Sequence, residues 1–280
     1  MNSRIRVSII GVGNAGFRLA VSLKSSGVEV ISVINRRIDS AKLLASILNK
    51  PENNPYKLAD TIYSNSYDSA NGSDIILLSV SDKAIDEVTQ NVLSISSVRD
   101  GFTTVCHISG AVSIDSLSNL PSYGVFYPLM TLSKNKPIDI SITPFLIEYS
   151  DNFSGQKIKD LCNTIGSEFS VVKSSDRLKM QIAAVYVSSF ANYLSALAYE
   201  IASPNHVLLL PLAVETIRKA FLYGDPALVQ TGPESRGDFD TIKKHLDALM
   251  DMPEHIQIYQ LISKSITDKL KQLNQRNVKF

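Results

Sequence analysis

The sequence contains few cysteines and almost no net charge, and each absence excludes a class of protein. Cys106 and Cys162 are the only cysteines among 280 residues, and 28 Lys and Arg against 27 Asp and Glu give a formal charge of +1. Two cysteines cannot build a disulfide framework, and a chain without a basic block lacks the phosphate-neutralising surface of a nucleic-acid-binding protein. We therefore expect a small-molecule substrate and a second copy of the chain as partners, and no nucleic acid.

We also expect no secretory signal in the apolar stretch near Met1, because its residues predict a strand that runs directly into a glycine loop. This pattern and the cysteine content predict a reduced, cytoplasmic protein. Internal repeats and low-complexity tracts are absent as well. The length then suits either one large α/β unit or two ordinary domains with a sizeable core.

One stretch, from Met180 to Tyr199, contains no charged residue. About 20 helical residues would span a bilayer core. Polar residues interrupt this stretch, however, and no second span accompanies it; they are Gln181, Ser188, Ser189, Asn192 and Ser195. A helix that is apolar nearly all round is equally suited to the centre of a helical domain or a dimer, so we predict no membrane span.

Apolar runs alternate with helical patterns through the first half, which predicts an α/β fold with a Rossmann-type, doubly wound and mostly parallel sheet. The predicted strands are 5–10, 29–34, 73–80, 102–110 and one near 123–129, and the segments 144–150 and 168–172 extend the sheet at one edge. The predicted helices are 14–26, 39–49 with Asp39 as its cap, and 82–97. From Arg177 onward the patterns are helical only. We therefore predict a dinucleotide-binding domain over 1–173 and a helical substrate and dimerisation domain over 174–280.

The stretch Gly11-Val12-Gly13-Asn14-Ala15-Gly16 follows the first strand and opens the first helix. In this context G-x-G-x-x-G is typical of a dinucleotide site, because the glycines permit a tight turn, close approach of a pyrophosphate and close packing of helix on strand. The phosphates then face the helix amino end. A glycine-containing turn of another α/β fold is the alternative. The predicted cofactor contacts here are Gly11, Gly13, Asn14, Ala15 and Gly16.

The end of the second strand indicates which dinucleotide binds. An NAD site usually places an acidic residue there for the ribose hydroxyls, whereas this chain has Asn35, Arg36 and Arg37. No carboxylate would repel a 2′-phosphate, and a guanidinium binds phosphate with two parallel hydrogen bonds. The sequence therefore favours NADP, unless the two arginines are simply solvated.

Two further strand ends should lie at the same edge of the sheet. Val80 and Ser81 follow one strand and are expected to contact the cofactor, while Asp82 is expected to cap the next helix. The motif "HISG" ends another strand, where His107 could reach the nicotinamide or a substrate, and Ser109 and Gly110 supply a hydroxyl and open backbone. A structural role for His107 is the alternative.

The chain resembles a family of bacterial proteins that join a Rossmann-like domain to a helical domain of unknown function. These proteins are similar to deazaflavin-dependent NADP oxidoreductases, and more loosely to pyrroline-5-carboxylate reductase and the 6-phosphogluconate dehydrogenase superfamily. The resemblance covers most of the chain and rests on "GVGNAG", "HISG", "YGVFYPLMTL", "IAAVYVSSFANYLSALAYE", "PLAVET" and "TGPESRGDFDTIKKHL". It implies NADP at the glycine loop and a helical second domain like that of 6-phosphogluconate dehydrogenase.

The resemblance also implies a substrate cleft between the two domains. It places there His107, Ser109, Gly110, Tyr127, Pro128, Asn192, Thr231, Gly232 and Pro233. From their positions on the strand end and on the long helix, we take His107 and Asn192 as the candidate catalytic residues. Relatives tend to have His where this chain has Gln181, and often Asn where it has Ser189, which leaves acid–base roles at those two positions open.

The long helix carries a polar stripe if it turns by about 100° per residue. Asn192 lies at its centre, flanked by Ser188 and Ser195, and Asn192 and Ser188 are predicted to contact substrate. Gln181 and Tyr199 complete the stripe. Close packing against another helix is the alternative explanation. Lys179 projects nearly opposite the stripe, so we do not expect it to act as a catalytic acid.

These observations predict an NADP-dependent oxidoreductase that transfers a hydride to or from a small metabolite, with no metal and as a homodimer. The cofactor supplies the hydride chemistry, while the protein orients the substrate and supplies a proton. A non-catalytic NADP(H)-binding regulatory protein and an NADPH:deazaflavin oxidoreductase are the alternatives.

Overall fold

The computed structural model describes residues 4–277. The chain divides into two compact units, residues 1–189 and residues 190–280. The division falls inside one continuous helix rather than at residue 173, where the composition changes. The first turns of that helix pack against the sheet, and this contact assigns them to the first unit.

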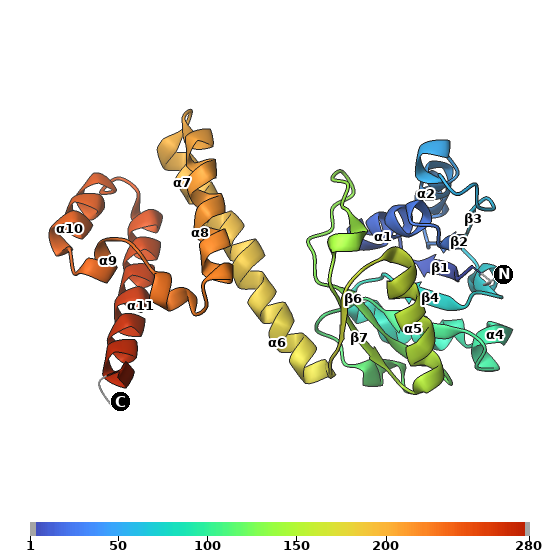
Figure 1. The fold of residues 1–280 in the computed structure, drawn as a ribbon. Helices are drawn as coiled ribbons and strands as arrows, with labels where there is room; N and C mark the ends of the chain where they lie inside the picture. The colour runs from blue at the N-terminus through green and yellow to red at the C-terminus, as the bar shows by residue number, and fades with distance from the viewer. Residues whose placement is uncertain (1–3, 278–280) are drawn as a thin grey trace. The chain divides into compact units, whose positions relative to one another are not determined.

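The first unit is built on one eight-stranded sheet, whose strands are seen from blue to green in Figure 1. The strand order is β3-β2-β1-β4-β5-β6-β7-β8, and every neighbouring pair is parallel except the antiparallel pair β6 and β7. The strands are β1 Arg6–Ile10, β2 Glu29–Ile34, β3 Ile62–Ser64, β4 Ile75–Leu78, β5 Thr104–His107, β6 Tyr123–Pro128, β7 Phe145–Tyr149 and β8 Phe169–Val171. The predicted mostly parallel sheet is confirmed.

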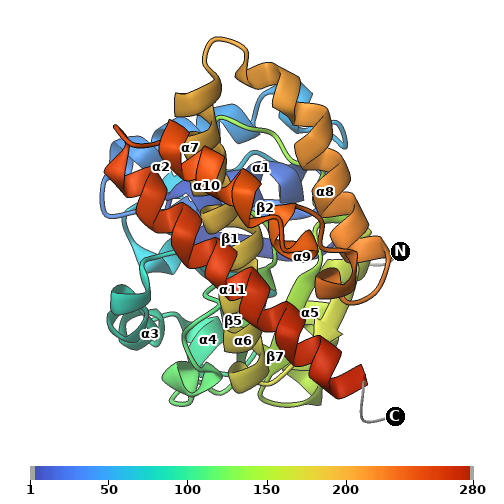
Figure 2. The same ribbon diagram turned by 90° about the vertical axis from the view of Figure 1, so that its left-hand side faces the viewer.

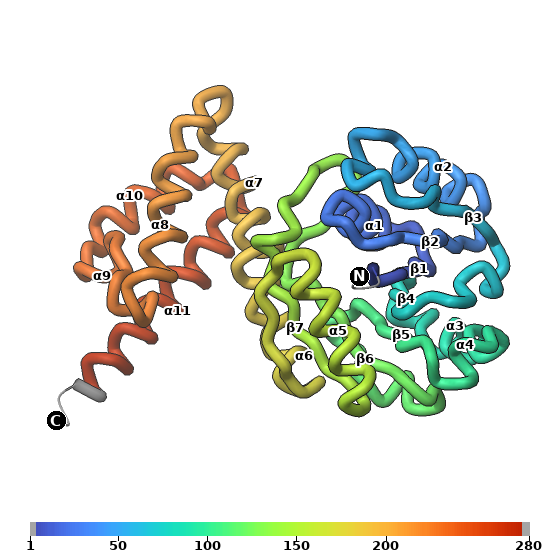
Figure 3. Tube along the Cα trace, turned by 45° about the vertical axis from the view of Figure 1, so that its right-hand side comes forward, coloured from blue at the N-terminus to red at the C-terminus, as the bar shows by residue number. Residues whose placement is uncertain are grey.

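Helices cover both faces of this sheet, as a doubly wound fold requires. On one face α1 (Asn14–Ser25), α2 (Ile38–Leu48) and α5 (Asn152–Ile165) bury leucines and isoleucines against the sheet. On the other face α3 (Ile85–Val92) and α4 (Ser96–Arg99) bury a second cluster. The central strands are therefore apolar on both sides, and β4 is buried at all four positions. Figure 3 shows α5 beside β6 and β7.

Three details of the sheet unit differ from the sequence prediction. The predicted helix 82–97 is divided into a 3₁₀ turn at Asp82–Ala84, α3 and α4, because Ile95 adopts an extended conformation (φ −71°, ψ 123°) and buries its side chain. Asp39 does not cap α2: the cap residue is Arg37, and Asp39 lies in the first turn. The short strand β3 is unpredicted because two of its three residues are exposed, so it lacks an apolar run.

The second unit is helical, as predicted. Its helices are α7 Ala191–Ala202, α8 Leu210–Leu222, α9 Pro233–Arg236, α10 Phe239–Ala248 and α11 Pro253–Asn277. Figure 2 shows α11 as one long red helix. Within residues 190–275, Leu197 and His255 are the only buried side chains. The helical unit thus has almost no core of its own.

The long helix consists of α6 (Ser174–Val185), a π-helical turn at Tyr186–Phe190, and α7. A π turn closes its hydrogen bonds from residue i to i+5 and so contains more residues per turn than an α-helix. The angles calculated for a regular α-helix therefore do not hold across it. Gln181 precedes this turn and Asn192 follows it, so they do not belong to one regular polar stripe.

Candidate cofactor and substrate site

The glycine loop has the geometry that close approach of a dinucleotide requires. Gly11 adopts φ +100°, and a Cβ there would lie 2.3 Å from the Ser79 carbonyl oxygen. A Cβ on Gly16 would lie 2.2 Å from the Gly11 carbonyl oxygen, so that residue brings α1 close to the strand. Beside Gly13, by contrast, nothing lies within 4 Å of the Cβ position. The loop is closed toward the protein and open at Gly13, where a pyrophosphate would approach.

A cleft of about 440 Å³ opens above this loop, at the carboxyl ends of β1, β2 and β4. Of the predicted cofactor contacts, seven line it: Gly11, Gly13, Asn35, Arg36, Arg37, Val80 and Ser81. Asn14, Ala15, Gly16 and Ser109 do not line it. Gly13 caps α1 without a side-chain hydrogen bond, which leaves the helix amino end to an anion. The residues present therefore fit a dinucleotide.

The two arginines at the cleft are exposed, and neither forms an ion pair within residues 4–277. Asn35 beside them has a different task. Its side chain accepts from the Val12 amide at 3.4 Å and donates to the Arg37 carbonyl at 3.0 Å, which braces the glycine loop against the end of β2. The guanidiniums of Arg36 and Arg37 are thus the groups left to bind a phosphate.

Sequence reasoning missed several residues that line the same cleft, among them Asn65, Tyr67, Glu87 and Val88. Asn65 and Tyr67 follow β3, which the apolar pattern does not reveal, so no signal pointed to them. Glu87 and Val88 lie on α3, and their helical spacing from Ala84 was visible but indicated only a helix face. Asp82 was expected to cap a helix, yet the residue at that cap is Ser81, without a side-chain hydrogen bond.

His107 is the last residue of β5, in register with Leu78 and Val125 of its two neighbours. Its side chain is fully buried, and Nδ1 accepts a hydrogen bond from the Ser109 amide at 3.2 Å. Nε2 makes no hydrogen bond of normal geometry, although the Ser113 backbone is close enough to raise its pKa slightly. Burial, aided by Arg177, outweighs this and lowers the pKa to about 4. The ring is therefore neutral and supports the "HISG" loop from below.

Ser109 also supports this loop. Its hydroxyl accepts from the amides of Ala111 and Val112 at 3.1 and 3.2 Å. The predicted contact of Ser109 with the cofactor would therefore compete with these two hydrogen bonds.

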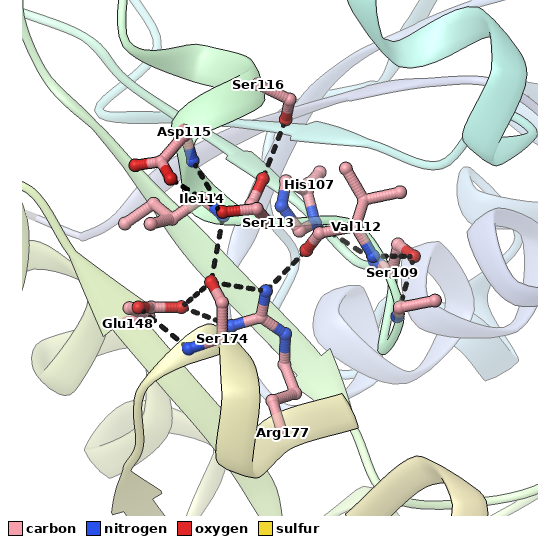
Figure 4. A network of polar contacts seen from close by, with 11 residues as sticks. His107, Ser109, Val112, Ser113, Ile114, Asp115, Ser116, Glu148, Ser174 and Arg177 are labelled. Carbon is pink, nitrogen blue, oxygen red and sulfur yellow. Dashed lines mark hydrogen bonds and ion pairs between the residues drawn. The ribbon is translucent and has the colours of Figure 1, made fainter. Parts of the chain in front are cut away.

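A buried ion pair joins β7 to the start of the long helix, and a hydrogen bond of the same arginine reaches the loop after β5 (Figure 4). The Arg177 side chain is fully buried; it donates to the Glu148 carboxylate, to the Val112 carbonyl and to the Ser174 hydroxyl. Ser174 in turn donates to Glu148 at 2.7 Å and accepts from the Ile114 amide at 3.0 Å. This network fixes α6 to β7 and to residues 112–114 at the same time. Neither residue of the pair was predicted, because nothing in the sequence links Glu148 to Arg177.

Gly110, Tyr127 and Gln181 also come together in the sheet unit. A Cβ on Gly110 would lie 2.8 Å from Cζ of Tyr127 and 2.9 Å from Cδ of Gln181. Gly110 and Tyr127 were predicted substrate contacts, and Gln181 was the departure from the family pattern. Pro128, also predicted, is buried beside Tyr127.

The remaining predicted substrate residues lie farther along the chain. The hydroxyl of Ser188 donates to the Ala184 carbonyl, so it is bound to its own helix. Asn192, at the start of α7, is exposed and makes no side-chain hydrogen bond to the described residues. Thr231 is exposed, and Gly232 precedes α9 with φ +123°. Their contact with substrate stays a prediction.

Lys179 is 77% exposed and pairs with Asp176 at 3.1 Å. A solvated lysine bound to a carboxylate is consistent with the expectation that it is no catalytic acid.

Two general properties concern the chain as far as it is described. Across residues 4–277, no three His, Cys, Asp or Glu residues are grouped so that they could hold a metal ion. The helix Ser174–Ala202 is long and apolar enough to cross a membrane by length and composition, a test that core helices of soluble proteins also pass.

Two family models match the chain. Residues 1–131 match a Rossmann-like domain, and residues 143–266 match a domain of unknown function, DUF2520. A search of curated proteins gave no match.

Solved structures resemble the chain over nearly its whole length. A Bacteroides fragilis protein provisionally named an NADP oxidoreductase is 28% identical, with a TM-score of 0.80 over 95% of this chain and 98% of that one. Pyrroline-5-carboxylate reductase of Coxiella burnetii is 14% identical, with a TM-score of 0.58 over 97% and 99% of the two chains. Plasmodium falciparum pyrroline carboxylate reductase with NADP bound is 12% identical, with a TM-score of 0.57 over 94% and 100%. The last two identities establish a shared fold only.

Proposed function

The chain combines a Rossmann-like domain with a DUF2520 domain, as the family resemblance predicted, and from this premise we propose that it is an NADP-dependent oxidoreductase acting on a small metabolite. Its fold is that of NAD(P)-dependent oxidoreductases. The observation that carries the proposal is the cleft above the glycine loop, where Arg36 and Arg37 have no ion-pair partner in the described chain. When bound, NADP would supply the hydride chemistry.

Different residues of the cleft would bind different parts of the cofactor. The amino end of α1 and Gly13 would hold the pyrophosphate, because the helix end carries partial positive charge and no side chain obstructs it. Arg36 and Arg37 would hold the 2′-phosphate that distinguishes NADP from NAD. A carboxylate at this strand end would repel that phosphate, and the chain has none there.

A soluble, cytoplasmic protein fits the contacts of the long helix. Gln181 packs on Gly110 within the sheet unit, and Tyr193 donates its hydroxyl to the Glu254 carboxylate within the helical unit. The 11 residues between them span about 17 Å of helix, well short of the roughly 30 Å of a bilayer core. The Glu254 carboxylate, which accepts the hydrogen bond from Tyr193, is also unsuited to the hydrocarbon of a bilayer.

Cofactor preference tests the proposal most directly. We expect tighter binding of NADPH than NADH, and Arg36→Ala should weaken NADPH by about tenfold or more while leaving NADH unchanged, since a hydrogen bond to a charged group contributes about 1.5–3 kcal/mol. Calorimetry with both cofactors measures this. Lys42→Ala is the matched control, because it removes an exposed positive charge from α2 that does not line the cleft. Equal affinities of the wild type for the two cofactors would refute the NADP assignment.

Turnover separates the catalytic proposal from its rivals. NADPH oxidation is followed by absorbance with a panel of aldehydes, ketones, imines and a deazaflavin. Consumption with a small carbonyl or imine supports the proposal, and consumption with the deazaflavin alone identifies a deazaflavin reductase. Tight NADPH binding without consumption by any acceptor indicates a non-catalytic NADP(H)-binding protein.

A further inference from the structure

Two polar side chains meet at the carboxyl ends of β5 and β6, the two strands that follow β4 in the sheet. Tyr127 is the penultimate residue of β6, Gly110 follows the end of β5, and Gln181 comes from α6. The Tyr127 Cζ and Gln181 Cδ atoms lie 2.8 and 2.9 Å from one point above Gly110, so they cannot be farther apart than those two distances together. The phenol hydroxyl and the amide are each bonded to one of these carbons. Gly110 is the residue that leaves room for both.

Neither polar group is used by the protein itself. Within residues 4–277, the Tyr127 hydroxyl and the Gln181 amide make no hydrogen bond, and both side chains are half-buried. Partly buried polar groups are normally satisfied by protein or by bound water or ligand. By comparison, the neighbouring polar side chains Ser109, Ser174 and Arg177 are all held by the loop network. Tyr127 and Gln181 are therefore the groups at this edge that remain available to a ligand.

The charge near Tyr127 and Gln181 determines which kind of ligand these two side chains favour. Arg177 is fully buried and close enough to act electrostatically on Tyr127 and His107. Burial raises the pKa of Tyr127 and Arg177 opposes this rise, so the phenol stays protonated near neutral pH. Glu148 offsets part of the Arg177 charge, but Tyr127 and His107 respond to Arg177 and not to Glu148. The guanidinium therefore disfavours a cationic ligand here and favours an atom that gains negative charge during reaction. A carbonyl oxygen meets this condition on accepting a hydride, whereas a protonated imine does not.

Building on the proposed function, we propose that Tyr127 and Gln181 bind the reacting carbonyl oxygen of a neutral aldehyde or ketone, and that Tyr127 donates the proton. The carbonyl carbon gains the hydride, and the carbonyl π pair moves to oxygen. The Tyr127 Oη–H bond breaks as an O–H bond forms on the product alcohol. The phenolate then regains a proton from water. The net change is carbonyl plus NADPH plus H⁺ to alcohol plus NADP⁺. Gln181 orients the oxygen by donating its amide hydrogen.

A fluorine NMR experiment tests the binding step without turnover. The full chain is labelled with 3-fluorotyrosine, and the Tyr127 resonance is assigned by its loss in Tyr127→Phe. With NADP⁺ present, a series of aldehydes and ketones is added, followed by the amines of matching carbon skeleton. We expect at least one carbonyl compound, and no amine, to shift this resonance, and Gly110→Ala and Gln181→Leu to abolish the shift. A resonance shifted only by amines, or by no carbonyl compound in the series, overturns the proposal.

Kinetics test the proton transfer with the acceptor found in the turnover panel. Tyr127→Phe should lower kcat by about 100-fold or more with unchanged NADPH affinity, and Gln181→Leu should mainly raise KM. Tyr123→Phe is the matched control, because it removes a phenol hydroxyl from the other end of β6. Wild-type turnover that Tyr127→Phe leaves unchanged refutes the role of Tyr127 while the proposed function stands. If the wild type neither binds nor consumes NADPH, the proposed function itself fails, and the same NMR titration without NADP⁺ then decides whether Tyr127 and Gln181 bind carbonyl compounds.

Discussion

His107 is a residue whose surroundings determine its charge. Sequence reasoning gave it either a catalytic or a structural role, and the structure encloses its ring completely, with Nδ1 bound by the Ser109 amide. In this conformation the ring has no solvent-accessible surface through which it could touch a ligand. A ring that is buried and neutral should instead make the stability of the sheet unit depend on pH.

We expect the free energy of unfolding to fall by about 2 kcal/mol between pH 7.5 and pH 5 because of His107. The unfolded histidine binds its proton as the pH falls through 6.5, but in the fold it remains neutral until its pKa of about 4. The unfolded state therefore binds more protons in this range and gains stability as the pH falls. Urea unfolding across the range measures the effect.

The variant His107→Asn removes the titrating group and keeps an acceptor for Ser109. Its unfolding free energy should depend less on pH than that of the wild type. Carboxyl groups with a lowered pKa, such as Asp151, act at lower pH and are common to both proteins. Parallel curves for the two proteins would contradict the assigned neutral state.

At the residue level, the sequence identified residues that line the glycine-loop cleft but not the contacts between distant segments. Gly11, Gly13 and Arg36 are close in sequence, and their spacing alone is enough to predict a phosphate-binding site. Gln181 and Gly110 are 71 positions apart, and Arg177 and Glu148 belong to different elements. Only folding brings such pairs together, so composition and periodicity contain no signal for them.

The ion pair of Glu148 and Arg177 connects strand β7 to helix α6 and so holds the helix on the sheet. A buried guanidinium without its carboxylate is costly, because no water replaces the lost partner. The pair also organises Ser174 and the carbonyl of Val112. We therefore expect its loss to loosen the helix from the sheet.

Glu148→Gln should lower the free energy of unfolding by about 3–5 kcal/mol, the usual range when one partner of a buried pair is removed. Replacing both partners, as in Glu148→Leu with Arg177→Met, should cost less than the Glu148→Gln change, since no unpaired charge remains. Urea unfolding compares the variants. Lys179→Ala is the control: its pair with Asp176 is exposed, so the change should be within about 0.5 kcal/mol. An effect of Glu148→Gln no larger than the control would contradict a stabilising connection.

Element boundaries followed the sequence where apolar runs were long, and departed from it where local geometry changed. The strand Glu29–Ile34 was predicted with its observed bounds, because its apolar residues lie between clear turn signals. The π turn at Tyr186–Phe190 leaves no trace in the pattern of apolar residues, since one extra residue in a turn looks like a regular helix. The predicted polar stripe depended on that regularity.

At the scale of the whole molecule, the helical unit leaves most of its apolar side chains exposed. Leu210, Val214, Ile217 and Phe221 repeat at helical spacing along α8, and each is about half to two-thirds exposed. With only Leu197 and His255 buried among residues 190–275, the unit buries too little apolar surface to offset the entropy of ordering it. The homodimer predicted from the sequence would cover this surface.

Light scattering should give twice the 30.7 kDa mass of the chain at micromolar concentration. Val214→Glu should shift the mass to that of one chain, because a carboxylate in a desolvated apolar interface has no partner. Ile142→Glu is the matched control, since Ile142 is 70% exposed and belongs to the sheet unit rather than to the helical unit. A single-chain mass for the wild type would rule out the dimer.

The packing of the first turns of α6 against the sheet also determines where this protein can be divided into portable modules. A chain ending at Lys173, where composition changes, would discard the guanidinium that neutralises Glu148 and the hydroxyl that binds the Ile114 amide. A chain ending at Ser189 retains both. In exchanges of sheet and helical modules with relatives, the junction that preserves a soluble, cofactor-binding sheet module should therefore lie near residue 189, and hybrids joined at 173 should aggregate.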